Sequence, residues 1–354
     1  MPRLREDVFV PAWSSDELDS PVSPQIEPAY FDPHLDAWVL SRYEDVLTAF
    51  RSSGLTIDSK RPRTMEDEKA TERMRAETAK ALSPAQLRAW SEVTTPLIQV
   101  RAQELPEGRP VDLVDAYLRP NCLDLASLVA GVDPKDAARL HALAQPVSAA
   151  AAEPSDPALR TEAKSVMSQL QGCFHSKTET LRESGFVALS YTLPCMLANA
   201  CYALIQNPRQ WTLLHREPDL AEQAVEELMR YAGLSRILRR QATEDLILGG
   251  VSIRKGDRLI LRIIAANHDP ERFARPDELD VCRRGAGHLT LGAGLHACVG
   301  ASLLRMASVA MVRPLVALFS SAVLTGPITW QGGSGFRSPK HLTALLHREA
   351  ASSR

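Results

Sequence analysis

A single cysteine, Cys298, stands in a glycine-rich run that could hold a metal ion. The run extends from His288 to Gly300 and reads HLTLGAGLHACVG, and an apolar, helix-like stretch follows it. Gly292 and Gly294 allow a tight loop with positive φ angles, so the loop can present one thiol at the start of a helix. Backbone N–H groups and the helix dipole at such a position favour the thiolate over the thiol. A lone thiolate placed in this way is suited to be the axial ligand of a haem iron.

Two other interpretations of this run have to be weighed. A free cysteine is usually a small buried hydrophobe, and a glycine-rich turn before a helix can also bind a phosphate. The run resembles, however, the haem-binding loop of the cytochrome P450 family, whose pattern is Phe-Gly-x-Gly-x-His-x-Cys-x-Gly. Five positions fall in register with that pattern: Gly292, Gly294, His296, Cys298 and Gly300.

The resemblance implies a cofactor and several binding residues. Cys298 is expected to ligate the iron of a haem b, His296 to contact a haem propionate, and Gly292 and Gly300 to shape the binding loop. Leu291 stands where the family has phenylalanine. This difference removes an aromatic ring near the thiolate, so it is expected to affect the tuning of the iron and not its ligation.

A second motif lies about seventy residues before Cys298. Residues 221–230 read AEQAVEELMR and consist of strong helix formers. Glu227 and Arg230 are three residues apart, so they share a helix face and can pair. An exposed pair of this kind would contribute little to stability, but the spacing resembles the Glu-x-x-Arg helix of the family, in which the pair is buried and supports the haem loop. Glu278 stands where many relatives have an arginine partner for this pair, which leaves the third member open.

Two arginines are candidates for binding haem propionates. Residues 239–253 alternate in the manner of strands around a Gly-Gly turn, and they resemble the family segment whose propionate-binding arginine corresponds to Arg240. Residues 71–84 resemble the helix that crosses the haem edge, where relatives carry His-x-x-x-Arg. Thr71 replaces the histidine and Arg75 keeps the arginine. The fork of a guanidinium group can hold a carboxylate in two contacts, although Arg240 could also be a solvated charge on a strand.

The predicted helix over residues 184–206 departs from the family pattern. In relatives the centre of this distal helix reads Ala-Gly-x-Asp/Glu-Thr, and the acid and the alcohol deliver protons during oxygen activation. The aligned residues 188–192 read ALSYT, so only the alanine and the alcohol remain. Pro194 follows, and a proline in a helix interior removes a hydrogen bond and forces a kink. We expect that kink to open a carbonyl group in place of the missing glycine bulge.

Thr192 and Tyr191 are therefore the candidate catalytic residues of the distal helix. Tyr191 replaces the acid, but a phenol with a reference pKa near 10 is a poor proton donor. Thr192 could deliver protons or contact the substrate, and it could equally well bond to the carbonyl four residues before it.

The 354 residues are 45% hydrophobic, which is enough for one large core. Helical signals dominate, and strand signals cluster at 36–41 and 246–264, with a weaker set near the C-terminus. We therefore predict a mainly α fold with small β-sheets at one edge, and the resemblance implies one cytochrome P450-like unit over residues 1–354. The alanine-rich stretch 148–158, which contains two prolines, is predicted to be a surface loop. The chain is shorter than soluble relatives between about 165 and 190, where one helix is expected to be reduced.

The charge balance and the cysteines limit the cellular compartment and the classes of partner that we expect. The chain has 41 basic and 43 acidic residues, a balance that argues against a nucleic-acid partner. Its six cysteines show no paired spacing. We also see no apolar N-terminal leader and no run of about twenty apolar residues for a membrane span. These features predict a cytoplasmic protein with reduced thiols, similar to the soluble bacterial branch of the family.

Two functions remain open at this point. The resemblance implies a haem-thiolate oxidoreductase, a monooxygenase acting on a small-molecule intermediate of secondary metabolism such as antibiotic biosynthesis. It would use a ferredoxin-type electron donor if it depends on oxygen. The altered distal helix favours non-standard oxygen activation, use of peroxide or a ring closure. The alternative is an accessory protein that stabilises a partner enzyme such as a glycosyltransferase. The intact cysteine loop argues against it, because a haem-free helper has no physical need for a thiolate. A haem sensor ranks last, since no output domain is visible.

Overall fold

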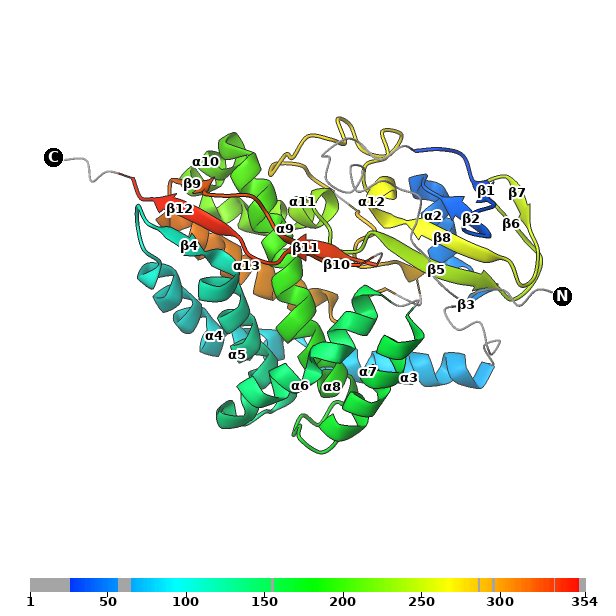
Figure 1. Cartoon of the computed structure of the whole chain (residues 1–354), viewed down its shortest axis with the longest axis horizontal. Helices are drawn as coiled ribbons and strands as arrows, with labels where there is room; N and C mark the ends of the chain where they lie inside the picture. Colours follow the sequence, from blue (N-terminus) through cyan, green and yellow to red (C-terminus); the bar gives the residue numbers. More distant parts are fainter. Residues whose placement is uncertain are drawn as a thin grey trace.

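The computed structural model describes residues 26–56, 65–153, 156–285, 287–294, 297–333 and 335–349. Figure 1 shows most of the helices on the left and the five-stranded sheet with the β6-β7 hairpin on the right, while β4, β9 and β12 lie on the left beside the helices. This arrangement confirms the predicted mainly α fold with small sheets, although the sheets are not all at the one edge that was predicted.

Twelve α-helices are present in the described residues. Their bounds are α2 (Tyr43–Arg51), α3 (Met65–Ala81), α4 (Pro84–Glu104), α5 (Arg119–Ala130), α6 (Pro134–Ala152), α7 (Pro157–Leu170), α8 (Glu183–Val187), α9 (Leu193–Gln206), α10 (Pro208–Arg216), α11 (Ala221–Tyr231), α12 (Ile263–Ala266) and α13 (Ala301–Leu318). Two π-helical segments, η1 (Val114–Leu118) and η3 (Ala188–Thr192), precede α5 and α9, and two short 3₁₀ turns are η2 (Glu179–Leu181) and η4 (Pro218–Leu220).

Four small sheets accompany the helices. The largest has five strands in the order β1-β2-β8-β5-β3, in which β2 and β8 run parallel and the other pairs antiparallel. A second sheet has the order β4-β12-β9, and β6-β7 and β10-β11 form hairpins. The strand bounds are β1 (Tyr30–Asp32), β2 (Ala37–Leu40), β3 (Leu55–Thr56), β4 (Pro110–Asp112), β5 (Ile237–Ala242), β6 (Leu246–Leu248), β7 (Val251–Ile253), β8 (Arg258–Arg262), β9 (Ser321–Leu324), β10 (Trp330–Gly332), β11 (Arg337–Pro339) and β12 (Thr343–His347). The predicted strand regions 36–41 and 246–264 are thereby confirmed.

Three helices start with a proline directly after a capping residue. The side chains of Ser83, Asp133 and Asp156 accept hydrogen bonds from backbone N–H groups in the first turns of α4, α6 and α7. Proline suits the first helical position, because its missing N–H would have no helical partner there. The predicted loop over residues 148–158 is therefore wrong at both of its ends, which are helical, while residues 154 and 155 lie outside the described residues. Alanines continue α6 to Ala152, and one of the two prolines starts α7 at residue 157.

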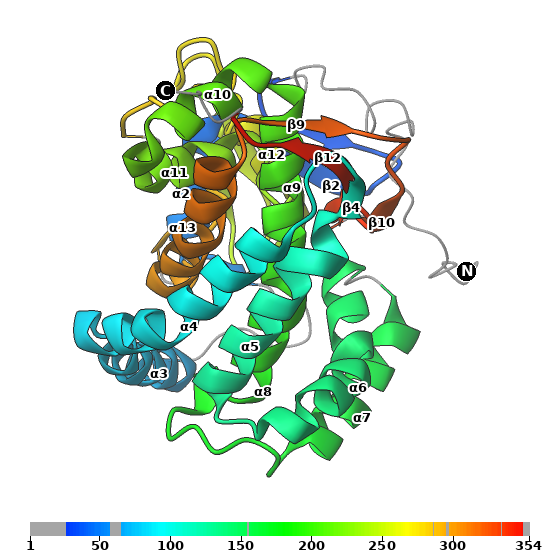
Figure 2. The ribbon, with the colours of Figure 1, turned by 90° about the vertical axis from the view of Figure 1, so that its left-hand side faces the viewer.

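The helices α6 and α7 lie side by side and pack against each other (Figure 2). Between α7 and α8 the described chain contains only the single turn η2. The segment α8-η3-α9 then runs through the middle of the helical part, and most of α9 is buried in the main hydrophobic core.

Two helical stretches are long and apolar enough to cross a membrane by length and composition alone. No such stretch was predicted from the sequence. The stretch Glu179–Gln206 has 72% of its most apolar window buried inside the protein, as is usual for a core helix. The stretch Ala301–Leu318 has 39% of its window buried. It carries Arg305 and Arg313, both of which form ion pairs, and cations of this kind are costly in a bilayer.

Candidate metal centre around Cys298

The glycine-rich run forms the predicted tight loop directly before α13. Gly292 and Gly294 have φ angles of +70° and +64°, which only glycine adopts readily. A Cβ atom on Gly294 would lie 2.9 Å from the carbonyl oxygen of Phe50, so the loop also passes too close to α2 for any larger residue. The backbone N–H of Cys298 donates to the Leu291 carbonyl at 2.6 Å. The loop therefore fixes the sulfur just ahead of the first residue of α13.

The thiol of Cys298 is half-buried, and its surroundings act in two directions. Burial raises its pKa, while a hydrogen bond from the Gly300 backbone and the charges of Arg305 and Arg75 oppose that rise. The backbone donor favours the thiolate as expected, but burial has the larger effect, so the net pKa is above the ordinary value. A bound cation reverses this balance, because a coordinating thiol is deprotonated outright.

Of the predicted propionate ligands, Arg75 contacts this loop directly, and Arg240 packs on Phe50, whose carbonyl lies beside Gly294. A guanidinium N–H of Arg75 donates to the Ala297 carbonyl at 2.7 Å, next to the cysteine. Arg240 lies on β5 with 6% exposure, and its guanidinium carbon is 5.7 Å from the ring centroid of Phe50. Arg240 is therefore not a solvated strand charge. A thiolate can ligate the iron of a porphyrin, and two guanidinium groups can bind its two carboxylates. These residues therefore fit a haem.

Two further positions of the family pattern were considered for the propionates. Thr71, which stands in the family's histidine position, donates its hydroxyl to the Asp67 carbonyl at 2.8 Å within its own helix. His296 lies outside the described residues. The predicted contact of His296 thus stays a prediction.

The Glu227–Arg230 pair is completely buried, with both side chains 0% exposed. It is bidentate: Arg230 Nε donates to Glu227 Oε2 at 2.7 Å, and Nη2 donates to Oε1 at 2.8 Å. The two N–H groups of Arg230 Nη1 donate to the carbonyls of Asn267 and Pro276, each at 2.8 Å. A buried arginine with all of these partners ties α11 to the chain that leads toward the cysteine loop.

The open third position of this network is filled by Arg283. Its Nε lies 3.0 Å from Glu227 Oε2, although the angle is too poor for a hydrogen bond. Glu278 instead pairs with Arg275 through its side chain at 2.8 Å and accepts from Arg230 through its carbonyl at 3.3 Å. Sequence reasoning missed Arg283, and the adjacent arginines at 283 and 284 were the only available signal.

A second polar cluster adjoins the first and was also missed. Glu226 forms a bidentate pair with Arg305, with contacts of 2.5 and 3.1 Å. Its Oε2 also lies 3.5 Å from Nε2 of His288. Glu226 and Arg305 line a groove of about 880 Å³ between α4, α11 and α13. This cluster links the start of the cysteine loop to the helix that follows it.

The distal helix is irregular at the predicted position. The segment Ala188–Thr192 forms a π turn, in which the backbone N–H of Leu193 donates to the carbonyl of Ala188. Pro194 explains the wider turn, because it has no N–H for the carbonyl of Ser190 and its ring would clash with that group. The Ser190 hydroxyl is buried and has no hydrogen-bond partner among the described residues. A bulge is thus present although Leu189 replaces the family's glycine.

Tyr191 and Thr192 have different surroundings. The phenol of Tyr191 donates to the His141 carbonyl at 2.5 Å, and the two rings stack with centroids 4.1 Å apart. Burial raises the pKa of Tyr191 to about 12, which makes it a still weaker acid. Thr192 is half-buried, and its hydroxyl forms no hydrogen bond with any residue that the structure describes. The hydroxyl therefore does not bond to the carbonyl four residues before it.

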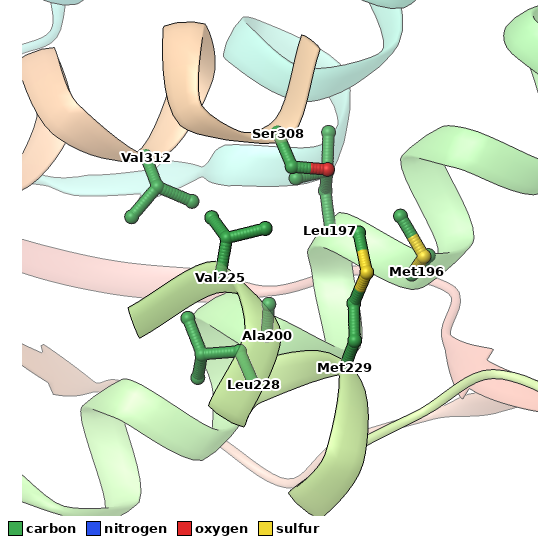
Figure 3. A pocket seen from close by; sticks show the side chains of 8 residues that line it. All are labelled: Met196, Leu197, Ala200, Val225, Leu228, Met229, Ser308 and Val312. Carbon is green, nitrogen blue, oxygen red and sulfur yellow. The ribbon is translucent and has the colours of Figure 1, made fainter. Parts of the chain in front are cut away.

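A small cavity lies between α9, α11 and α13 (Figure 3). Its volume is about 10 Å³, which is the space of a single water. Met196 and Met229 face it from two helices, and the buried Ser308 hydroxyl has no hydrogen-bond partner among the described residues. The cavity is too small to hold a substrate.

Comparison with known proteins agrees with the geometry around Cys298. The family model described as cytochrome P450 matches residues 214–336. The chain is 28% identical over 330 residues to cytochrome P450 CYP107DY1 of Priestia megaterium, covering 76% of this chain and 79% of that protein. It is 28% identical over 353 residues to nocardicin C N-oxygenase of Nocardia uniformis subsp. tsuyamanensis, covering 87% and 89%.

Solved structures share the fold. P450BioI in complex with an acyl carrier protein superposes with a TM-score of 0.77 at 21% identity, covering 91% of this chain and 96% of that chain. CxnD, described as forming a C–S bond in chuangxinmycin biosynthesis, gives 0.71 at 22% identity, covering 88% and 89%. These likenesses confirm the predicted fold.

Proposed function

Because the chain belongs to the cytochrome P450 family, we propose that it is a haem-thiolate monooxygenase whose iron is ligated by Cys298. When bound, the haem supplies the oxygen-activating chemistry, and the protein supplies ligation, orientation and charge. The observation that carries the proposal is the position of the Cys298 sulfur, which a loop with two positive-φ glycines fixes at the start of α13.

In this proposal Arg75 and Arg240 hold the two propionates. Arg75 uses only one of its five N–H groups on the Ala297 carbonyl, so the others can bind a carboxylate. Burial of Arg240 strengthens its attraction for an anion, since the effective dielectric is low there. His296 would add a further contact, while Gly292 and Gly300 keep the loop clear around the sulfur. Glu227 and Arg230 brace the core beneath it.

Thr192 is the distal residue that we assign to proton delivery or substrate contact. Its hydroxyl is half-buried and uncommitted within the described chain. We assign Tyr191 a positioning role, because its phenol is already committed to α6. Without the family's acid, the proton path would pass through the substrate or through water, which supports a non-standard activation of oxygen.

The substrate class is proposed from what the relatives act on. Nocardicin and chuangxinmycin are named for two of them, and a third is assigned to a bacillaene polyketide synthase. We therefore propose a small-molecule intermediate of secondary metabolism as the substrate, with a ferredoxin-type donor supplying electrons if oxygen is the oxidant. We also propose a cytoplasmic protein without membrane attachment; its described cysteines are all free, as is usual in a reducing compartment.

The test is the spectrum of the purified protein with Cys298 intact and replaced. We expect a haem Soret band, and a reduced carbon monoxide adduct at the long wavelength that is typical of thiolate ligation. Cys298→Ser should abolish that adduct, whereas the exposed Cys282→Ser should leave it unchanged. A protein that is produced with ample haem supply and carries none, or whose adduct survives Cys298→Ser, would refute the proposal.

The accessory-protein function is kept as an alternative because of one surface. Three apolar residues on the solvent side of α4, Val93, Leu97 and Val100, are each about half exposed (53%, 47% and 51%). Their spacing of four and three residues forms one stripe, of the kind that contacts another protein. A haem-free protein that raises the activity of a co-expressed glycosyltransferase, and loses this effect in Leu97→Glu, would favour the alternative.

A further inference from the structure

A buried asparagine connects the Glu227–Arg230 pair to the segment that leads into the cysteine loop. Asn267 directly follows α12 and is 1% exposed. Its backbone carbonyl accepts a hydrogen bond from Arg230 at 2.8 Å, and its backbone N–H donates to the Ile263 carbonyl at 3.0 Å. These two backbone bonds fix Asn267 against α11 and α12.

Both ends of the Asn267 amide contact the chain that enters the loop. Oδ1 accepts from the backbone N–H of Leu289 at 2.7 Å, and Nδ2 donates to the Thr290 hydroxyl at 2.8 Å. That hydroxyl in turn donates to the Met229 carbonyl on α11 at 2.5 Å. The amide cannot be reversed, because its NH₂ group would then face the Leu289 N–H, which is also a donor. The side chain therefore sets both the position and the direction of this segment.

The surroundings of the Thr290 hydroxyl leave room for this arrangement and for little else. A Cβ atom on Gly233 would lie 2.5 Å from that hydroxyl and 2.6 Å from the Met229 carbonyl. The neighbouring Leu289 side chain is 2% exposed and belongs to the same hydrophobic cluster as Phe50 of α2. The entry to the loop is thus held by polar contacts to α11 and by apolar contacts to the sheet side.

Two backbone hydrogen bonds carry this position to the cysteine. The N–H of Gly292 donates to the Leu289 carbonyl at 2.9 Å, which closes a turn over residues 289–292. Within this turn, the Leu291 carbonyl accepts from the N–H of Cys298 at 2.6 Å. A shift of Leu289 would therefore move the carbonyl that holds Cys298. Groups that act at a functional site have to be held within about 0.5 Å of their working geometry.

We propose that Asn267, acting with Thr290, is a positioning residue that fixes the turn before Cys298 and thereby places the iron ligand. The inference rests on the proposed function, because it concerns the ligand of that same site. Asn267 acts through the backbone of the loop and not through its charge. The position of the turn can therefore be measured independently of the iron.

The experiment compares variants at positions of matched burial. Asn267→Ala removes both amide contacts, and Asn121→Ala is its control, because Asn121 on α5 is also 1% exposed and uses both ends of its amide. Thr290→Val removes the hydroxyl that bonds to α11. Its control is Thr94→Val, which removes a buried hydroxyl that bonds to the Trp90 carbonyl within α4. Thr290→Ser keeps the hydroxyl and is the conservative variant.

Amide hydrogen exchange of the purified full-length proteins measures the turn directly. We expect the Gly292 and Cys298 amides to exchange about tenfold faster in Asn267→Ala and Thr290→Val, which is the factor that one lost hydrogen bond corresponds to. Both controls and Thr290→Ser should leave this exchange unchanged. In the haem-loaded proteins, the same two variants should lose part of the long-wavelength carbon monoxide adduct, whereas the controls should keep it.

Equal exchange in Asn267→Ala and Asn121→Ala, or in Thr290→Val and Thr290→Ser, would overturn the inference. Faster exchange with an unchanged adduct would overturn it as well, because the turn would then not place the ligand. If Asn267→Ala does not fold, the comparison of Thr290→Val with Thr290→Ser and Thr94→Val decides. If the unaltered protein shows protected Gly292 and Cys298 amides but no thiolate-ligated haem, the proposed function fails, while the exchange comparison still decides whether Asn267 fixes the turn.

Discussion

The proximal and distal sides of the Cys298 loop differ in how fully their polar side chains are engaged. On the proximal side, Glu227, Arg230 and Arg283 form a buried network, and Glu226 forms a second one beside it. On the distal helix, the Ser190 hydroxyl is buried without a described partner, and Tyr191 turns to α6. The match to the cytochrome P450 family model begins at residue 214, after the distal helix. Under the proposed function, cofactor attachment would depend on the proximal residues and proton delivery on the distal ones, and only the proximal residues follow the family pattern closely.

The largest effect is expected from breaking the proximal network. Arg230→Met leaves Glu227 buried with Arg283 and the Asp280 N–H as its described partners, and removing one partner of a buried pair costs roughly 3–5 kcal/mol. Arg139→Met is the matched control, because Arg139 forms an exposed pair with Asp136 at the same i,i+3 spacing, worth at most about 1 kcal/mol. Denaturant unfolding measures both. Equal losses would show that the proximal network does not support the fold.

The next largest effect is expected at Gly294 in the Cys298 loop. Gly294→Ala and Gly108→Ala both place alanine at a φ of +64°, but only Gly294 has a backbone oxygen within reach of the new Cβ. The shared backbone strain is about 1–2 kcal/mol. We expect Gly294→Ala to lose more stability than Gly108→Ala and to bind less haem. If the two variants have the same stability and the same haem content, the close approach of Gly294 to Phe50 does not contribute to either.

A smaller effect should separate the two distal candidates. Tyr191→Phe removes the hydrogen bond to the His141 carbonyl and should cost about 1 kcal/mol, with little change in product formed per oxygen consumed. Thr192→Val should leave stability unchanged and lower that ratio. Unfolding curves and coupled oxygen-consumption assays measure both variants. The reverse assignment of effects would make Tyr191 the proton-delivering residue.

The smallest expected effect is a pH dependence of the unfolding free energy that arises from His141, which stacks on Tyr191 of the distal helix. Burial, aided by the charge of Arg119, lowers the pKa of His141 from 6.5 to about 4. The unfolded chain then binds a proton that the folded chain resists, so stability should fall as the pH drops from 6.5 toward 4. His141→Gln removes this component and keeps the backbone carbonyl. The difference in unfolding free energy between the two proteins should therefore change across this window, and parallel curves would contradict the prediction.

Local sequence features predicted the loop and the strands well. Two glycines indicated positive φ angles around Cys298, and both have them. Burial of Glu227 and Arg230 followed from the family resemblance, since spacing alone allowed an exposed pair. The contact of Glu227 with Arg283 was not predictable, because it depends on how more than fifty intervening residues fold back. The alanine-rich end of α6 was mistaken for a loop because prolines were counted as helix breakers, while one of them starts α7.

The electrostatic state of the cysteine also required the structure. The position at a helix start correctly indicated donors near the sulfur, and Gly300 provides one. Sequence could not show that burial of the thiol outweighs those donors. Similarly, Pro194 indicated an irregular distal helix. The sequence did not indicate that the irregularity would be a π turn, which packs against α5 and α6.

The π turn at Ala188–Thr192 has one consequence for the rest of the distal helix. A π turn holds one residue more than an α-helical turn, so it acts as a single-residue insertion. Every side chain after Thr192 is rotated by about 100° from where a regular helix would place it. Deleting one residue from this turn would return the helix to a regular register, and Thr192 would then face a different part of the molecule. Alignments of this helix therefore need a one-residue gap before Pro194 when a relative lacks the bulge.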